Sequence, residues 1–206
     1  MLRFSAHLRT AKEWARQSYT FLLRPKVLVW FPLVALIQND VITFMNVSGR
    51  SMSPTLNPDA HRMNDVIVID KWHTLPGNKW KRGEVVVLRS PTTDRLIIKR
   101  IIALEGDKVS TLPPYPDPVV TIPEGHVWVE GDEPFHTLDS NSFGPVSLGL
   151  VHSKAPWIVL PFSRWGPVPP APRWKWIQSR VKRRREYGLE ELRQAVEASM
   201  LETKRE

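Results

Sequence analysis

Apolar residues gather most densely near the N-terminus of the chain. Val27–Ile37 and Val41–Val47 are two apolar runs, separated by Gln38, Asn39 and Asp40. As one helix, residues 27–47 would span roughly 31 Å, about the hydrocarbon thickness of a bilayer. The pattern predicts a membrane-anchor helix over residues 25–47, although a charge at Asp40 near the bilayer centre would cost about 2.5 kcal/mol or more. A buried core helix is the alternative interpretation.

From residue 64 onward the pattern changes to short β-branched runs that are bounded by turn residues. The runs are Asp65–Asp70, Gly83–Arg89, Arg95–Leu104 and His126–Glu130. No helical crossover separates them, so they indicate antiparallel rather than parallel pairing. The predicted fold class is therefore mainly β, with one antiparallel β-domain over residues 48–165. The proline-rich segment Leu112–Pro118 is expected to be an exposed, extended loop.

The two ends of the chain carry its positive charge. Residues 1–26 hold six Lys or Arg and one Glu, and residues 171–206 hold ten Lys or Arg and six Glu. The body between them is nearly neutral, which argues against a nucleic-acid groove across the β-domain. Residues 1–24 are rich in Arg and Ser and are typical of a mitochondrial targeting segment, with a solvated basic helix as the alternative.

The C-terminal part, residues 166–206, is predicted to be a Pro/Trp-rich linker followed by a basic helical tail from Trp174 onward. Its run Lys182–Arg185 fits a nucleic-acid patch, a solvated helix or a contact with anionic lipid headgroups. The chain has no cysteine, which excludes disulfides and thiolate chemistry. Its histidines are scattered, so no metal and no cofactor are expected.

Three clusters carry residues that are suited to catalysis. Ser48–Leu56 follows the apolar run and contains Ser51, a candidate nucleophile; a linker loop is the alternative interpretation. In Leu96–Ile102, strand alternation puts Lys99 on one face with Ile97 and Ile101. A lysine in such surroundings loses solvation, which favours its neutral form. A neutral amine can take the proton of a serine hydroxyl, whereas an edge-strand lysine with its amine in water would not.

The third cluster is Gly131–Pro145, which is rich in turn formers and short polar side chains. Together the three clusters resemble the type I signal peptidase family of Ser/Lys proteases. The matching patterns are Ser-Gly-x-Ser-Met-x-Pro-Thr-Leu at 48–56, Lys99-Arg100 leading to Gly-Asp at 106–107, and Gly-Asp, Asp-Ser and Phe-Gly-Pro within 131–145. Most members have arginine where this chain has Asn141. This difference, with the Arg-rich N-terminus, points to the mitochondrial branch of the family.

The resemblance implies a role for each matching residue. Ser51 would be the nucleophile and Lys99 the general base, and the Ser51 backbone N–H would donate to the oxyanion. Gly49 stands where some bacterial members place a hydroxyl of the oxyanion hole, so that donor is missing or comes from elsewhere. Thr137 would orient Lys99, and Asp139 would support the same loop. Met52 is a candidate lining residue of a substrate pocket.

Arg100 is interpreted as structural. The resemblance also implies a signal-peptidase-like β-domain in the mitochondrial inner membrane, held by a single span and facing the intermembrane space. Its implied partners are presequence-bearing precursor proteins, a sister protease subunit and the lipid bilayer, and no nucleic acid is expected. Two other hypotheses stay open. One is a catalytically silent β-domain whose basic tail binds nucleic acid or lipid. The other is a signal peptidase of the bacterial or endoplasmic-reticulum type.

Overall fold

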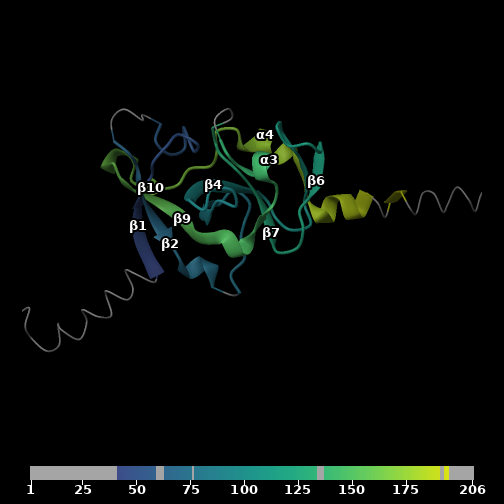
Figure 1. Ribbon diagram of the computed structural model, residues 1–206, viewed down its shortest axis with the longest axis horizontal. Helices are drawn as coiled ribbons and strands as arrows, with labels where there is room; N and C mark the ends of the chain where they lie inside the picture. The colour runs from purple at the N-terminus through teal and green to yellow at the C-terminus, as the bar shows by residue number, and fades with distance from the viewer. Residues whose placement is uncertain (1–40, 59–62, 76, 134–136, 191–192, 195–206) are drawn as a thin grey trace, which may run out of the picture. The chain divides into compact units, whose positions relative to one another are not determined.

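The β-branched runs of the sequence form the strands of an antiparallel sheet (Figure 1). The computed structural model describes residues 41–58, 63–75, 77–133, 137–190 and 193–194. Residues 44–206 make up one unit, and of the other unit, 1–43, only residues 41–43 are described. The large sheet contains β1 (Ile42–Asn46), β2 (Val66–Asp70), β3 (Val85–Arg89), β4 (Leu96–Ala103), β7 (His126–Glu130), β8 (Val146–Ser147), β9 (Val151–Leu160) and β10 (Gly166–Pro167).

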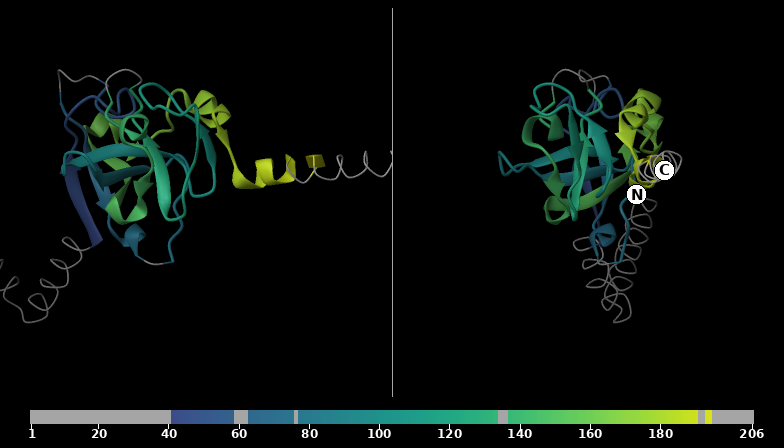
Figure 2. Two further views of the ribbon diagram at one scale, coloured as in Figure 1. Left: turned by 45° about the vertical axis from the view of Figure 1, so that its right-hand side comes forward. Right: turned by 90° about the vertical axis from the view of Figure 1, so that its right-hand side faces the viewer.

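Strands that are distant in sequence are neighbours in this sheet. Its order is β1-β2-β9-β3-β4-β7-β8, and β10 pairs with β9. A smaller sheet has the order β11-β5-β6, and Figure 2 shows both sheets from two further sides. The strands of the smaller sheet are β5 (Lys108–Ser110), β6 (Val119–Thr121) and β11 (Val181–Lys182). The named helical elements are α3 (Ser140–Phe143), α4 (Trp174–Ser179) and the 3₁₀ turns η2 (Trp72–Thr74), η3 (Leu148–Leu150) and η4 (Phe162–Arg164), and residues 184–190 are also helical.

Strand β4 lies at the centre of the core. Alternate side chains of a strand point to opposite faces, and both faces of β4 meet apolar neighbours. Ile98 packs against one hydrophobic cluster, Ile97 and Ile101 belong to a second, and Ile102 and Ala103 belong to a third. The residues between them, Lys99 and Arg100, are therefore held inside the protein, and each is only 2% exposed.

The predicted strands are confirmed, with bounds that differ by one or two residues at their ends. The sequence analysis missed β9, although it is the longest strand described and pairs with β2, β3 and β10. Pro156 lies within it and argues against a central strand, because proline has no N–H for the ladder. In the structure β9 pairs with β3 through Lys154 and with β10 from Trp157 onward. Pro156 therefore lies where β9 changes neighbour.

Two expectations at the ends of the chain need correction. Residues 42–46, predicted as the end of the anchor helix, form strand β1; Ile42, Thr43 and Phe44 are β-branched or aromatic and suit a strand. Most of the predicted anchor, up to residue 40, lies outside the described residues. Within the described ranges, no helix has the length and apolarity to cross a bilayer.

The C-terminal tail is not continuously helical. Helical backbone is found at 174–179 and 184–190, but Val181 and Lys182 form β11 and pair with β5. Residues of this segment also enter the core, since Ala171 is 5% and Ile177 6% exposed. Burial of this apolar surface stabilises the attachment of the C-terminal segment to the β-domain.

Candidate active site

Lys99 projects from the middle of β4, where β3 lies alongside it and pairs Val86 with Lys99. Its strand neighbours Val86 and Ile101 belong to the second core cluster, and Lys99 is 2% exposed. This burial lowers the pKa of Lys99 from its ordinary value of 10.5 to about 8, while the negative charges of Asp139 and Asp132 act in the opposite direction. Loss of solvation is the larger effect, and a substantial fraction of the amine is neutral near physiological pH.

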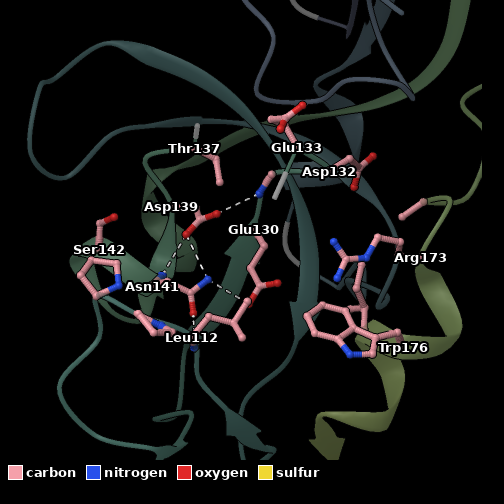
Figure 3. Close-up of a pocket in the computed structure, with 15 residues that line it drawn as sticks. Leu112, Glu130, Asp132, Glu133, Thr137, Asp139, Asn141, Ser142, Arg173 and Trp176 are labelled. Atoms are coloured by element: carbon pink, nitrogen blue, oxygen red, sulfur yellow. Dashed lines mark hydrogen bonds between the residues drawn. The ribbon is translucent and has the colours of Figure 1, made fainter. Parts of the chain in front are cut away.

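The loop between β7 and α3 holds the amine of Lys99 in place. Lys99 Nζ donates a hydrogen bond of 2.8 Å to Thr137 Oγ1. Asp139, which is 2% exposed, accepts from Gly131 N at 3.1 Å and from Asn141 N at 3.0 Å, and it caps helix α3 (Figure 3). The carboxylate thereby fixes both ends of the segment that carries Thr137. Thr137 contacts the Lys99 amine and Asp139 lies in the same loop, and their roles in catalysis stay predictions.

Ser51 is half-buried and lies in a turn that is held by hydrogen bonds at Ser51 itself and downstream at Asn57. Its carbonyl oxygen accepts a hydrogen bond from Glu133 N at 3.2 Å. Downstream, Asn57 Nδ2 donates to the carbonyl of Val47 at 2.8 Å, and Asn57 and Asp65 exchange two backbone-to-side-chain hydrogen bonds of 2.8 and 2.7 Å. The loop is therefore closed at its base by buried polar groups, which are costly to leave unpaired.

Gly49 and Met52 lie on either side of Ser51 in this turn. Gly49 has a φ of +89°, in the left-handed region that favours glycine. Met52 is 2% exposed and packs with Val47 and Leu56 in the first core cluster. A role of Met52 in a substrate pocket stays a prediction. Gly49 has no hydroxyl, and the effect of this on the oxyanion hole also stays a prediction.

Gly131 is the point at which the two halves of the candidate site meet. A Cβ atom at this position would overlap with the carbonyl oxygen of Ser51 and with the side chain of Thr137. The Ser51 turn and the residue that contacts Lys99 Nζ thus lie against the same glycine. The pairing of β4 with β7 brings Lys99 close to the Gly131 loop, and the hydrogen bond from Glu133 N to the Ser51 carbonyl holds the Ser51 turn against the same loop.

Arg100 points to the other face of β4 and connects four segments. Nε and Nη2 of Arg100 form a bidentate ion pair with Asp132 at 2.9 and 2.7 Å, and Nη1 donates to the carbonyl of Gly83 at 2.7 Å. Nη2 also donates to Pro169 O at 3.1 Å and to Thr55 Oγ1 at 3.5 Å. These contacts support the structural interpretation of Arg100. Through Thr55, they also connect Arg100 to the segment that follows Ser51.

Sequence reasoning missed the polar network that supports the loop from behind. Glu130 accepts from Asn141 Nδ2 at 3.1 Å and from Trp128 Nε1 at 2.9 Å, and it forms an ion pair with Arg180 of the C-terminal segment. Asp132 was noticed as part of a motif but received no role. The only signal for such residues is a charged side chain in or beside an apolar run, which does not say which partner it finds.

The described part of the chain contains no group of three or more His, Cys, Asp or Glu residues placed to hold a metal ion. The turn that carries Ser51 and the threonine that contacts the buried amine of Lys99 both lie against Gly131. A hydroxyl and a base are the minimal parts of nucleophilic catalysis.

Comparison of the sequence with known proteins shows the family of this protein. Residues 21–113 match the family described as "Signal peptidase, peptidase S26". The chain is 42% identical to mitochondrial inner membrane protease subunit 2 of Schizosaccharomyces pombe over 144 residues, which cover 69% of this chain and 78% of that protein. The protein belongs to the signal peptidase family, peptidase S26, and is a serine protease of the signal peptidase type.

Further relatives point to the same branch of the family. Mitochondrial inner membrane protease subunit 2 of Saccharomyces cerevisiae is 42% identical over 139 residues, covering 66% of this chain and 78% of the relative. The human protein of that name is 44% identical over 135 residues, covering 65% and 76%. The resemblance to the signal peptidase family and to its mitochondrial members, expected from the sequence, is confirmed.

Gly131→Ala is expected to lower kcat/KM by about 100-fold, because the added methyl group pushes the Ser51 turn away from Thr137 and Lys99. A displacement of about 1 Å in a catalytic constellation costs an effect of this size. The measurement is cleavage of a precursor peptide by the full-length protein in detergent. Gly188→Ala is the matched control, since a Cβ there has nothing within 4 Å. If Gly131→Ala stays within twofold of wild type, the two segments do not need this close approach.

Proposed function

We propose that this protein is a membrane-bound endopeptidase in which Ser51 and Lys99 form a Ser/Lys dyad that removes sorting presequences from proteins of the mitochondrial intermembrane space. The observation that carries the proposal is the state of Lys99. Its amine is buried, its pKa is lowered to about 8, and Thr137 holds it beside the Gly131 segment that contacts Ser51. A pKa near the working pH is what a general base needs.

In the first half of the proposed reaction, neutral Lys99 takes the proton of the Ser51 hydroxyl while Oγ attacks the scissile carbonyl. The tetrahedral oxyanion receives a hydrogen bond from the backbone N–H of Ser51, a group that makes no hydrogen bond with the described residues. When the C–N bond breaks, the Lys99 ammonium returns the proton to the leaving amine. The products of this step are an acyl-Ser51 ester and the new N-terminus of the mature protein.

In the second half, Lys99 accepts a proton from water, and the resulting hydroxide attacks the ester. Collapse of that intermediate breaks the bond to Ser51 Oγ, and Lys99 returns the proton to the serine. The presequence leaves with a free carboxylate. Thr137 keeps the amine directed at the reacting atoms through both halves, and Asp139 keeps Thr137 in place.

The names of the relatives and the charge of the N-terminus support a proposed location and partner for this protein. The relatives at about 40% identity are named as subunits of a mitochondrial inner membrane protease. We therefore place this chain in the inner membrane as a single-pass protein, with the catalytic domain in the intermembrane space and a sister subunit as its partner. Positive charge before the predicted anchor favours retention of the N-terminus on the matrix side.

One of the two other hypotheses is a catalytically silent β-domain. Membership of a protease family argues against it. The bacterial or endoplasmic-reticulum type of signal peptidase is disfavoured by the mitochondrial names of the relatives. Its distinguishing result would be a protein that is absent from isolated mitochondria.

The test is processing of a bipartite presequence in mitochondria whose own copy of this protein has been replaced. Wild-type protein should mature the precursor, and Ser51→Ala should leave it uncleaved while still reaching the membrane and co-purifying with its partner subunit. Ser48→Ala is the matched control, because Ser48 is exposed and lies in the same motif. Processing by Ser51→Ala at more than a tenth of the wild-type rate would exclude Ser51 as the nucleophile.

A further inference from the structure

A cavity of about 530 Å³ lies between the Asp139 loop and helix α4. Its lining includes Gly131 and Thr137, the prolines Pro113 and Pro114, and Trp176 and Ile177 of α4. Figure 3 shows Thr137 and Trp176 on opposite sides of the cavity. Its volume lies within the range of roughly 300–1,000 Å³ that is usual for binding pockets. The reaction proposed above uses none of the residues that α4 contributes.

The acidic residues around this cavity are mostly neutralised by the protein itself. Asp132 is paired with Arg100, and Glu130 is paired with Arg180. Asp139 is satisfied by backbone N–H groups. Carboxylates that are already paired contribute little attraction for a charged ligand. The remaining apolar lining is provided by Leu112, the prolines, Ala171, Ile177 and the ring of Trp176, and further polar lining by Glu133, Asn141, Ser142 and Arg173.

The side chain of Trp176, which lines the cavity, is held in place by two arginine side chains. Guanidinium groups stack over its ring from Arg173 at 4.3 Å and from Arg180 at 4.6 Å. Arg180 is anchored in turn by its ion pair with Glu130 and by a hydrogen bond of 3.0 Å from Nη1 to the carbonyl of Ser110. Contacts of a cation with an aromatic face stabilise such an arrangement. The two guanidinium groups therefore hold the ring in place beside the cavity, which lowers the entropic cost of binding at this wall.

The cavity adjoins the candidate active site through Thr137. Thr137 contacts Lys99 Nζ on one side and lines the cavity on the other. In the reaction proposed above, Lys99 returns its proton to the leaving amine, so the amine side of the substrate must face Thr137. The residues that follow the scissile bond then extend toward α4.

We propose that this cavity is the subsite for a large apolar side chain among the first residues after the scissile bond, with Trp176 as its specificity-determining residue. The proposal rests on the proposed protease function and extends it to the mature part of the substrate. An apolar occupant matches the proline, isoleucine and tryptophan surfaces, and burial of its side chain supplies the binding free energy.

The experiment uses the full-length protein with its partner subunit in detergent and a peptide series with one fixed presequence side. Alanine occupies the first four positions after the scissile bond, and a single leucine or tryptophan is moved through them. Wild type should show a gain of about 10-fold in kcat/KM at one position, mainly through KM, as expected for filling an apolar pocket. Trp176→Ala should reduce this gain to less than twofold.

Two further variants separate the subsite from a general loss of structure. Ser142→Trp places a large side chain at an exposed position of the cavity lining, so it should abolish the gain by filling the space. Trp72→Ala, at an exposed tryptophan of η2 outside the lining, should keep the full gain. The subsite is refuted if wild type cleaves every peptide without a position-dependent gain, or if the gain survives in either Trp176→Ala or Ser142→Trp. Failure of wild type to cleave any peptide overturns the protease proposal together with the subsite.

Discussion

Lys99→Met is expected to lower kcat/KM by about 10⁴-fold, the upper end of what acid–base catalysis by one group contributes. Methionine has nearly the length of lysine but cannot accept a proton from Ser51 or return one to the leaving amine. Because Lys99 is 2% exposed, the substitution also removes an amine that is poorly solvated. The unfolding temperature of the detergent-solubilised protein should therefore not fall, which separates chemistry from folding.

Two control variants sharpen this result. Lys99→Arg retains a cation, but a guanidinium stays protonated at every accessible pH, so it should be as inactive as Lys99→Met. Lys182→Met changes a strand lysine whose side chain is 66% exposed, and it should cleave at the wild-type rate. Cleavage by Lys99→Met at more than a tenth of the wild-type rate would show that another group is the base.

The pH dependence of the wild-type protein follows from the same lysine. Burial lowers the pKa of Lys99 to about 8, and only the neutral amine can act as the base. Below pH 8 the value of kcat/KM should therefore fall about tenfold for each pH unit, and above pH 8 it should level off. Single-turnover cleavage between pH 6 and pH 9 measures this directly. A profile that is flat across this range would contradict a base of this pKa.

Arg100→Met is expected to destabilise the protein by about 3–5 kcal/mol, because it leaves Asp132 buried without its counter-ion. Both side chains are almost completely buried, at 2% and 1% exposed. The substitution also leaves the carbonyls of Gly83 and Pro169 without their donor. For a domain of this size the unfolding temperature should fall on the order of 10 °C.

Measurement of thermal unfolding in detergent tests this expectation against two other variants. Arg89→Met removes an ion pair with Asp94 whose partners are 59% and 81% exposed, and it should change stability by less than about 1 kcal/mol. Adding Asp132→Leu to Arg100→Met removes the orphaned carboxylate and should restore part of the loss. If Arg100→Met unfolds at the wild-type temperature, the buried pair does not stabilise the fold.

The sequence was most informative where a residue type is demanded by its local position. Lys99 and Arg100 stand out because two charges interrupt a run of isoleucines, and strand alternation alone places them on opposite faces. β9 was missed because the local signal of Pro156 opposes a strand, and only the change of neighbour at that residue makes it acceptable. The tail was predicted as one helix because β11 depends on pairing with β5, about 70 residues earlier.

By itself, then, the sequence determined the class of fold, the candidate dyad Ser51 and Lys99, and the loop with Thr137 and Asp139. These depend on periodicity and on short motifs, which local chain geometry preserves. The tertiary structure decided that the Ser51 turn and Thr137 meet at Gly131, that Arg100 links Asp132 to Thr55 after that turn, and that α4 lines a cavity beside Thr137. Those features depend on distances between segments far apart in the chain, and such distances are set only when the core packs.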